Sequence, residues 1–320
     1  MKRACLALLL ITCLCGDALA QGFPDKPIKL VVPFPPGGAT DLIARVVAEG
    51  AAEVLGQPVV IENLAGAGGN IATARVAKAL ADGYTLSLCS IGTCAINMSV
   101  YANPGYDILK DFAPVVLVGG VMNVVAANND FPARTMPELQ AYAKANPGKV
   151  NFGSSGIGTS NHLTAEWFKL VTGVQMVHVP YKGAALALTD LMGGQIHFVV
   201  DNEPSVLPHI KAGKIRALAV TGPQRSASLP DVPTMEEAGY AGFVVEPWFG
   251  IITPAGTPPP VIARLNEAFN KAMQTPRIRK RLEDVAVRVL GGTPQRMAEQ
   301  IRSDLDRWGK VVKANQIRAE

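Results

Sequence analysis

Short apolar runs alternate with amphipathic stretches along most of the chain. The expected strands lie at residues 28–32, 59–61, 85–89, 112–118, 124–127, 176–179, 196–200, 215–220 and 248–253. The expected helices include residues 41–54, 70–79, 259–274 and 294–312, where apolar side chains recur at helical spacing. Thr135 and Glu138 are spaced as a capping box that opens a further helix. Alternating strands and helices are typical of an α/β protein.

Two segments far apart in the chain share one design. Residues 28–41 and 149–162 each read as a buried strand, a loop rich in small residues, and the start of a helix. A helix start carries unpaired N–H groups and the positive end of the helix dipole, so it attracts anions. The sequence therefore predicts a small anionic ligand held between two parts of the molecule.

The first loop reads Pro-Pro-Gly-Gly-Ala-Thr-Asp and ends at Asp41. Its two prolines stiffen the chain, and Gly37 and Gly38 allow the backbone to approach a ligand closely. Thr40 or Asp41 is suited to cap the helix. We expect Asp41 to brace the loop, because its charge has the wrong sign for direct contact with an anion.

The second loop offers the hydroxyl groups of Ser154, Ser155, Thr159 and Ser160 beside a helix start. Such groups bind carboxylates directly or through water. An exported hydrolase using Ser154 or Ser155 is the alternative of a different class. Residues 153–157 lack the final glycine of a G-x-S-x-G elbow, and His162 on the same helix is poorly placed for a triad. We therefore expect no enzyme activity.

Other motifs add little reactive chemistry. Residues 66–71 match a dinucleotide loop only in part, and no phosphate-binding P-loop occurs, so no cofactor is expected. Neither anion loop contains an arginine, which favours a carboxylate over a phosphate. Lys182 either contacts the ligand or lies in solvent at a helix start. Asp201 either contacts a hydroxyl or ammonium group of the ligand or caps the next helix.

The N-terminus reads as a cleavable secretory signal. Lys2 and Arg3 precede an apolar core, and Ala18-Leu19-Ala20 fits a cleavage site. Residues 1–20 would thus direct the protein to the periplasm. The whole chain has a formal net charge of +4, which becomes +3 when Lys2, Arg3 and Asp17 are removed. This small, dispersed excess does not indicate binding to nucleic acid.

Cys89 and Cys94 are the cysteines that remain after such cleavage. In an oxidising compartment they either form a small-loop disulfide or stay unlinked, and the sequence does not decide between the two. Two cysteines without nearby histidines do not complete a metal site.

Several motifs, in this order, resemble those of one family. They are Pro33-Phe34-Pro35-Pro36-Gly37-Gly38-Ala39-Thr40-Asp41, Glu62-Asn63 to Gly66-Ala67-Gly68-Gly69, Asn151-Phe152-Gly153-Ser154-Ser155-Gly156, Val179-Pro180-Tyr181-Lys182-Gly183 and Leu229-Pro230-Asp231-Val232-Pro233-Thr234. With the exported N-terminus, they resemble the Bug family, the extracytoplasmic solute-binding proteins of tripartite tricarboxylate transporters. The resemblance covers essentially the whole mature chain.

The resemblance implies a type II periplasmic binding protein fold with two lobes, a central cleft and a hinge. Chain crossings near Gly119-Gly120 and after Val220 would give one lobe from residues 21–121 and 223–320 and another from 122–222. The implied partners are a small carboxylate and the membrane subunits of a transporter, and we expect a monomer. A ligand-sensing partner of a signalling receptor is a further alternative. The expected ligand-binding residues are Phe34, Gly37, Gly38, Ala39, Thr40, Asp41, Ser154, Ser155, Gly158, Thr159, Ser160, His162, Lys182 and Asp201.

Overall fold

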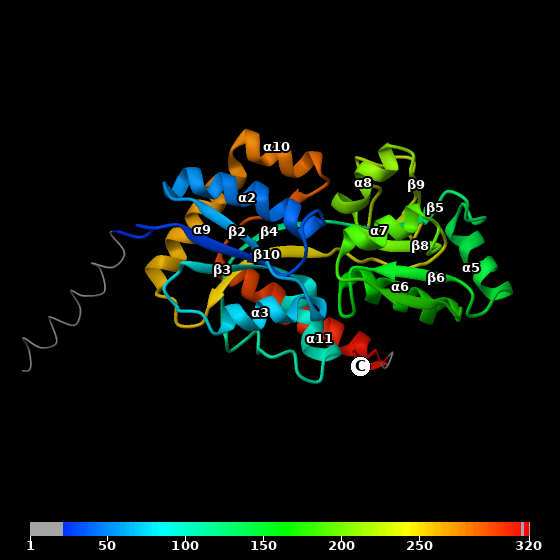
Figure 1. The fold of residues 1–320 in the computed structure, drawn as a ribbon, viewed down its shortest axis with the longest axis horizontal. Coiled ribbons are helices and arrows are strands. Elements are labelled where there is room, and N and C mark those ends of the chain that lie inside the picture. Colours follow the sequence, from blue (N-terminus) through cyan, green and yellow to red (C-terminus); the bar gives the residue numbers. More distant parts are fainter. Residues whose placement is uncertain (1–21, 315–316, 320) are drawn as a thin grey trace, which may run out of the picture.

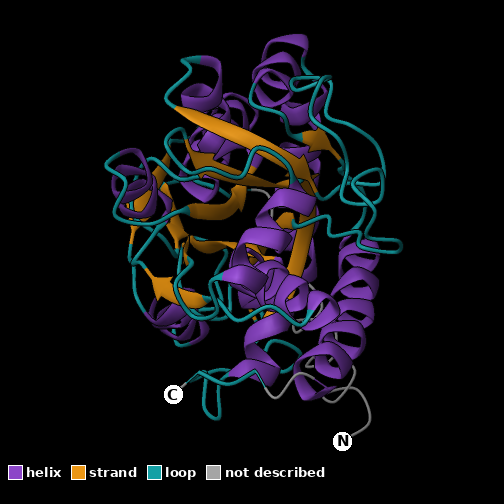
Figure 2. Cartoon of the chain, turned by 90° about the vertical axis from the view of Figure 1, so that its right-hand side faces the viewer, coloured by secondary structure: helices purple, strands orange, loops and turns teal. Residues whose placement is uncertain are grey.

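A computed structural model describes residues 22–314 and 317–319 (Figure 1). The predicted signal segment, residues 1–20, lies outside this range. The described chain forms two β-sheets that lie side by side, each with its own helices. Seen from the end of the second sheet, helices surround the strands (Figure 2). Within this range, none of the helices has both the length and the apolar character needed to cross a bilayer.

The first sheet has the strand order β11-β4-β10-β3-β1-β2. Its strands are β1 (Ile28–Val32), β2 (Val59–Asn63), β3 (Thr85–Ser90), β4 (Phe112–Gly120), β10 (Trp248–Pro254) and β11 (Arg288–Val289). β1 pairs in parallel with β2 and β3, whereas β10 and β11 run antiparallel to their partners. One face carries α2 (Ala39–Leu55), α9 (Pro259–Gln274) and α10 (Pro276–Asp284). The other carries α3 (Asn70–Ala77), α4 (Asn97–Val100), α11 (Pro294–Ala314) and the helical turns η1 (Ala67–Gly69) and η2 (Gly92–Ile96).

The second sheet has the order β7-β6-β8-β5-β9. Its strands are β5 (Asn123–Asn128), β6 (Asn151–Ser154), β7 (Val177–Pro180), β8 (Phe198–Asn202) and β9 (Ile215–Val220). The helices α5 (Met136–Ala145) and α6 (Ser160–Thr172) cover one face. The helices α7 (Ala184–Met192) and α8 (Glu203–Lys211) cover the other. The two lobes are therefore both three-layer α/β units.

Several elements differ from the sequence expectation. Gly119 and Gly120 belong to β4 and pair with β10 and β11, because antiparallel neighbours on both sides supply backbone partners. The chain crosses to the second sheet at residues 121–122. α10 was not predicted, since its nine residues are strongly charged and bury only Ile278 and Leu282.

The segment after β9 returns to the second sheet before it crosses. The Met235 N–H donates to Val220 O at 2.9 Å, and the Val245 N–H donates to Thr221 O at 2.9 Å. Phe243 stacks on Trp167 of α6 with 4.3 Å between ring centroids. The lobe bounds expected from the sequence assign residues 223–320 to the first lobe, and these contacts join part of that segment to the second sheet. The part that makes these contacts contains no helix or strand that would indicate them from the sequence, and the lobe boundary itself stays a prediction.

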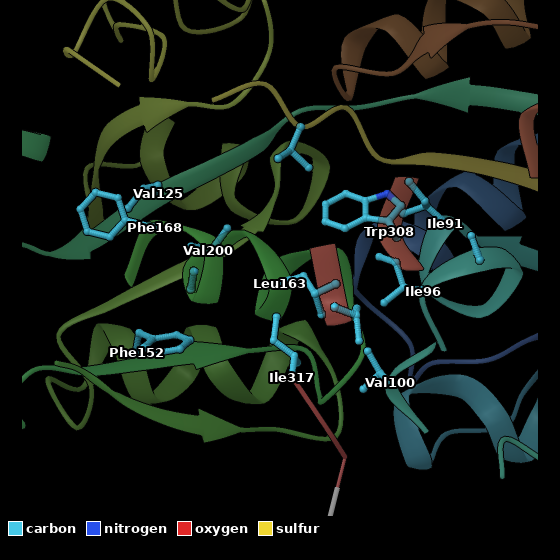
Figure 3. Packing of buried hydrophobic residues seen from close by; sticks show 14 of the residues in the cluster. Ile91, Ile96, Val100, Val125, Phe152, Leu163, Phe168, Val200, Trp308 and Ile317 are labelled. Atoms are coloured by element: carbon cyan, nitrogen blue, oxygen red, sulfur yellow. The ribbon is translucent and has the colours of Figure 1, made fainter. Parts of the chain in front are cut away.

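One apolar cluster continues from the first sheet into the second. Figure 3 shows Trp308 of α11 near Ile91 and Ile96, with Leu163 of the second lobe close by. The Trp248 indole N–H at the start of β10 donates to the Asp304 carboxylate of α11 at 2.6 Å. α11 is thereby fixed against the strand that returns from the second lobe.

Cys89 and Cys94 form a disulfide in the structure, and both side chains are fully buried. The bridge links the end of β3 to η2 and closes a loop that contains residues 90–93. Replacing both residues (Cys89→Ala with Cys94→Ala) should lower the free energy of unfolding by about 2 kcal/mol, because the bridge restricts the unfolded chain over a short loop. Urea denaturation under non-reducing conditions measures the change. An unchanged midpoint would contradict a stabilising bridge, and wild type unfolded in reductant is the control.

Candidate functional site

The first loop is held by Asp41, which is almost completely buried. Its carboxylate accepts hydrogen bonds from the Gly37 N–H at 3.0 Å, the Asn63 side-chain amide at 2.9 Å and the Arg45 guanidinium at 2.9 and 3.0 Å. Gly37 has a φ of +91°, a conformation that favours glycine. Asp41 thus ties the loop, α2 and β2 together, and it braces the site from behind.

Burial by itself raises the pKa of Asp41, but the hydrogen bonds from Arg45, Asn63 and Gly37 outweigh it. The pKa of this carboxyl is therefore lowered from its ordinary value of 3.8. Asp41 is ionised at neutral pH, and its charge is satisfied within the loop.

The second loop is held by side chains of its own lobe. The Thr159 hydroxyl donates to Gly156 O at 2.7 Å and accepts from the His162 N–H at 3.3 Å, so it caps α6. The Ser154 hydroxyl accepts the Gly156 N–H at 3.1 Å and lies 2.7 Å from His178 Nε2. These bonds fix the loop in one conformation.

His162 and His178 stack with 4.2 Å between ring centroids beneath this loop. Burial lowers the pKa of His162 to about 3 and that of His178 to about 4. Both rings are therefore neutral at physiological pH. Ser154 has no exposed surface, so the Ser154–His178 pair cannot meet a substrate in this conformation. Its role in the structure is to support the loop.

The two lobes touch at several points near the loops. The Ala39 N–H, at the start of α2, donates to the Ser205 hydroxyl of α8 at 2.9 Å. The Tyr101 hydroxyl of the first lobe donates to Ile157 O of the second at 2.9 Å. The described lobes are therefore in a closed arrangement.

A cavity that is partly open to solvent lies between the loops. From the first lobe it is lined by four of the predicted residues, Phe34, Gly38, Ala39 and Thr40. From the second lobe it is lined by Ser155, Thr159, Ser160 and Asp201. Loops at the carboxyl ends of strands thus meet across one space, as expected for open α/β sheets.

The other predicted residues do not line this cavity. Gly37, Asp41, Ser154, Gly158 and His162 lie behind its walls and support the loops. Lys182 lies at a neighbouring cavity, which is also bordered by Phe34, Ser155 and the glycine-rich turn at 66–69. The sequence does not distinguish residues that line the cavity from residues that support the loops, because spacing does not show which way a side chain points.

Several lining residues are not among those expected from the sequence. The polar ones are Ser90, Asn161, Asn202 and Ser205, and the apolar ones include Pro35, Ala184 and Pro247. Ser90 ends β3, so the rule that sites form at strand ends was a usable signal for it. Ser205 lies inside α8, and no motif marks it. Phe249 of β10 also borders the cavity.

Asp201 has only 1% of its surface exposed and lines the cavity. Its carboxylate accepts hydrogen bonds from the Asn202 N–H and the Asn161 side chain, both at 2.7 Å, and from the Ser155 hydroxyl at 3.3 Å. Burial raises the pKa of Asp201 to about 7, since these neutral donors offset only part of the cost.

Comparison with known proteins places this geometry in a family. Residues 43–317 match the model of the tripartite tricarboxylate transporter family receptor. The chain belongs to this receptor family. It is 41% identical to protein BugT of Bordetella pertussis over 295 residues, which covers 92% of this chain and 90% of BugT. The resemblance to Bug proteins is thereby confirmed.

Solved structures of the receptor family share the fold. One is the periplasmic binding protein BugD, with a TM-score of 0.90, 36% identity and coverage of 93% of this chain and 100% of that one. Another is Rpa4515 of R. palustris with adipate, with a TM-score of 0.90, 38% identity and coverage of 92% and 99%. A third is MatC of Rhodopseudomonas palustris with bound malate, with a TM-score of 0.87, 34% identity and coverage of 91% of this chain and 100% of that one. The predicted periplasmic binding protein fold is therefore confirmed.

Replacing Asp41 with asparagine should destabilise this receptor by about 1–3 kcal/mol at pH 7, because buried donors lose a charged acceptor. The lowered pKa sets the pH dependence. The contribution of Asp41 is fully present above pH 3.8 and is lost as the pH falls through the folded-state pKa. Urea denaturation of both proteins between pH 7 and pH 3 should show the difference narrowing at acid pH.

Asp284→Asn, which removes an exposed ion pair with Lys280, is the matched control and should change little. Equal stability of wild type and Asp41→Asn at pH 7 would contradict the bracing role.

Proposed function

We propose that the cavity of this receptor binds a small carboxylate through the two loops. The observation that carries the proposal is their arrangement across one cavity. Residues at the start of α2 line it from one lobe, and residues at the start of α6 line it from the other. The dipoles of both helices favour a negative charge there.

The lining favours a carboxylate over a phosphate. Among the described residues, no lysine or arginine lines the cavity. Its polar groups include the hydroxyls of Thr40, Ser90 and Ser160 and the amide of Asn161. Hydroxyls, N–H groups and bridging water suit one carboxylate, whereas a doubly charged phosphate usually takes an arginine or lysine.

The names of two relatives extend this proposal to dicarboxylates, since those structures hold adipate and malate. Lys182 lies at the neighbouring cavity, which shares Phe34 and Ser155 with the first. We infer that one carboxylate lies between the loops and that a longer ligand extends past Phe34 toward Lys182.

The transport role follows from family membership. We infer that residues 1–20 direct export to the periplasm. There the protein, as a monomer without enzyme activity, delivers its ligand to the membrane subunits of a tripartite tricarboxylate transporter. Ligand contacts from both lobes favour the closed state, so binding and closure are coupled.

Saturating carboxylate should raise the melting temperature, because it binds only the folded protein. At about 100 times Kd the gain is roughly 2.7 kcal/mol, which corresponds to roughly 4 °C for a chain of about 300 residues. Thr40→Val, which removes a cavity hydroxyl without changing shape, should weaken binding about tenfold. Thermal-shift titrations over mono-, di- and tricarboxylates measure both effects.

Thr189→Val, on the exposed surface of α7, is the control and should bind as wild type does. If no carboxylate stabilises the wild-type protein, the proposed function is wrong.

Ser205→Ala should shift the unliganded protein toward an open form by about fivefold, because one hydrogen bond between the lobes, worth about 1 kcal/mol, is lost. Small-angle scattering without ligand should then give a larger radius of gyration than wild type, and saturating ligand should reduce the difference. The control is Ser303→Ala on the exposed face of α11. Identical scattering by Ser205→Ala and wild type would show that this bond does not hold the lobes closed.

A further inference from the structure

The cavity proposed to take a carboxylate already contains one. Asp201 is the only ionisable side chain among the described residues that line it. Its Oδ1 accepts two N–H bonds, from Asn202 and from the Asn161 side chain, and its Oδ2 accepts the Ser155 hydroxyl. All three donors are neutral, so the ionised form has no positive partner at hydrogen-bond distance.

Charged and titratable groups on the surrounding elements do not supply that partner. They are Asp41, Arg45, Glu49 and Glu53 on α2, His162, Glu166 and Lys169 on α6, His178 on β7, Lys182 before α7, Asp190 on α7, and Glu203, His209 and Lys211 on α8. None of these groups lines the cavity or hydrogen-bonds to Asp201. Asp41 and Arg45 pair with each other, and His162 and His178 are neutral. Glu203 accepts from Ser226 and borders a different cavity, beside Arg288.

A bound carboxylate would therefore place a second negative charge beside Asp201 in a largely enclosed space. Two carboxylates that share one site without a cation cannot both remain ionised at little cost, and one of them takes up a proton. Asp201 already favours its neutral form because it is buried, as its pKa of about 7 indicates. It is the group expected to accept the proton.

We propose that this receptor takes up one proton on Asp201 when it binds a carboxylate that carries no cationic group. This inference rests on the proposed function, and it makes ligand affinity depend on pH. The proton comes from solvent and adds to Oδ2, since Oδ1 already accepts two N–H bonds. The neutral acid then donates its O–H to the ligand carboxylate, and no bond to carbon changes.

The direction of the pH dependence follows. Above pH 7 unliganded Asp201 is ionised, so binding requires a proton and Kd rises about tenfold per pH unit. Well below pH 7 Asp201 is already neutral, and Kd becomes independent of pH. A ligand with an ammonium group close to its carboxylate supplies its own positive charge and needs no proton.

Isothermal titration calorimetry between pH 6 and pH 8.5 tests this with adipate, malate and aspartate. Malate and aspartate form a matched pair, because a hydroxyl in one is an ammonium group in the other. Each titration is repeated in buffers of different ionisation enthalpy, so that the heat reports proton uptake. For adipate or malate we expect roughly one proton taken up at pH 8 and almost none at pH 6.

Asp201→Asn copies the neutral acid and should bind malate with an affinity that does not change with pH and without proton uptake. Glu203→Gln is the matched control, since it neutralises a buried carboxylate two residues away that faces another cavity. It should keep the wild-type proton uptake. If Asp201→Asn does not fold, the wild-type calorimetry alone decides the question.

The outcomes separate this inference from the proposed function. Adipate or malate binding with a Kd independent of pH and no proton uptake would overturn the inference and leave carboxylate binding in place. Binding of aspartate alone, without proton uptake, would also overturn it, since Asp201 would then pair with the ammonium group. Binding by none of the three, nor by any other carboxylate, would overturn the proposed function and the inference together.

Discussion

The hydrogen bond from the Ala39 N–H to the Ser205 hydroxyl joins the two lobes at the point where the ligand is expected. The first turn of α2 begins after Gly38, which has no side chain to cap it. Its N–H groups must therefore find partners elsewhere, because buried donors without acceptors are costly. One partner comes from the opposite lobe. This bond acts with the hydrogen bond from the Tyr101 hydroxyl to Ile157 O and with the apolar cluster shared by the two sheets to hold the lobes closed around the cavity.

Two buried aspartates, one in each lobe, have different hydrogen-bond partners and pKa shifts of opposite direction. Asp41 faces a guanidinium and an amide, so its charge is compensated and its pKa is lowered. Asp201 faces only neutral donors, and its pKa is raised to about 7. The first carboxylate holds a loop in place from behind, whereas the second borders the cavity. Burial alone does not assign a role to an aspartate, and the partners decide it.

Local pattern was sufficient to predict much of the fold. The apolar run of β1 and the cap at Thr135 appear where the sequence places them. The first helix was expected from residue 41 with Thr40 or Asp41 as its cap, but α2 begins at Ala39 after Gly38, so both residues lie inside its first turn. The two loops were found for the same reason, since glycine and hydroxyl residues beside a helix start have a direct physical meaning. Contacts between distant segments could not be predicted this way. Ser205 enters the cavity through the closure of the lobes, and residues 233–245 return to the second sheet through backbone bonds that leave no periodic signal.

Charge limits what the cavity can hold. The N-terminus of each helix carries about half a positive elementary charge. The negative charge of ionised Asp201 reduces this compensation. A ligand with two carboxylates can therefore desolvate only one of them between the loops, and the other must stay hydrated or approach a cation. Lys182 is exposed and borders the adjoining cavity, so it can supply that cation. Relatives whose structures hold adipate and malate could thus share one pair of loops and differ in the residues beyond Phe34.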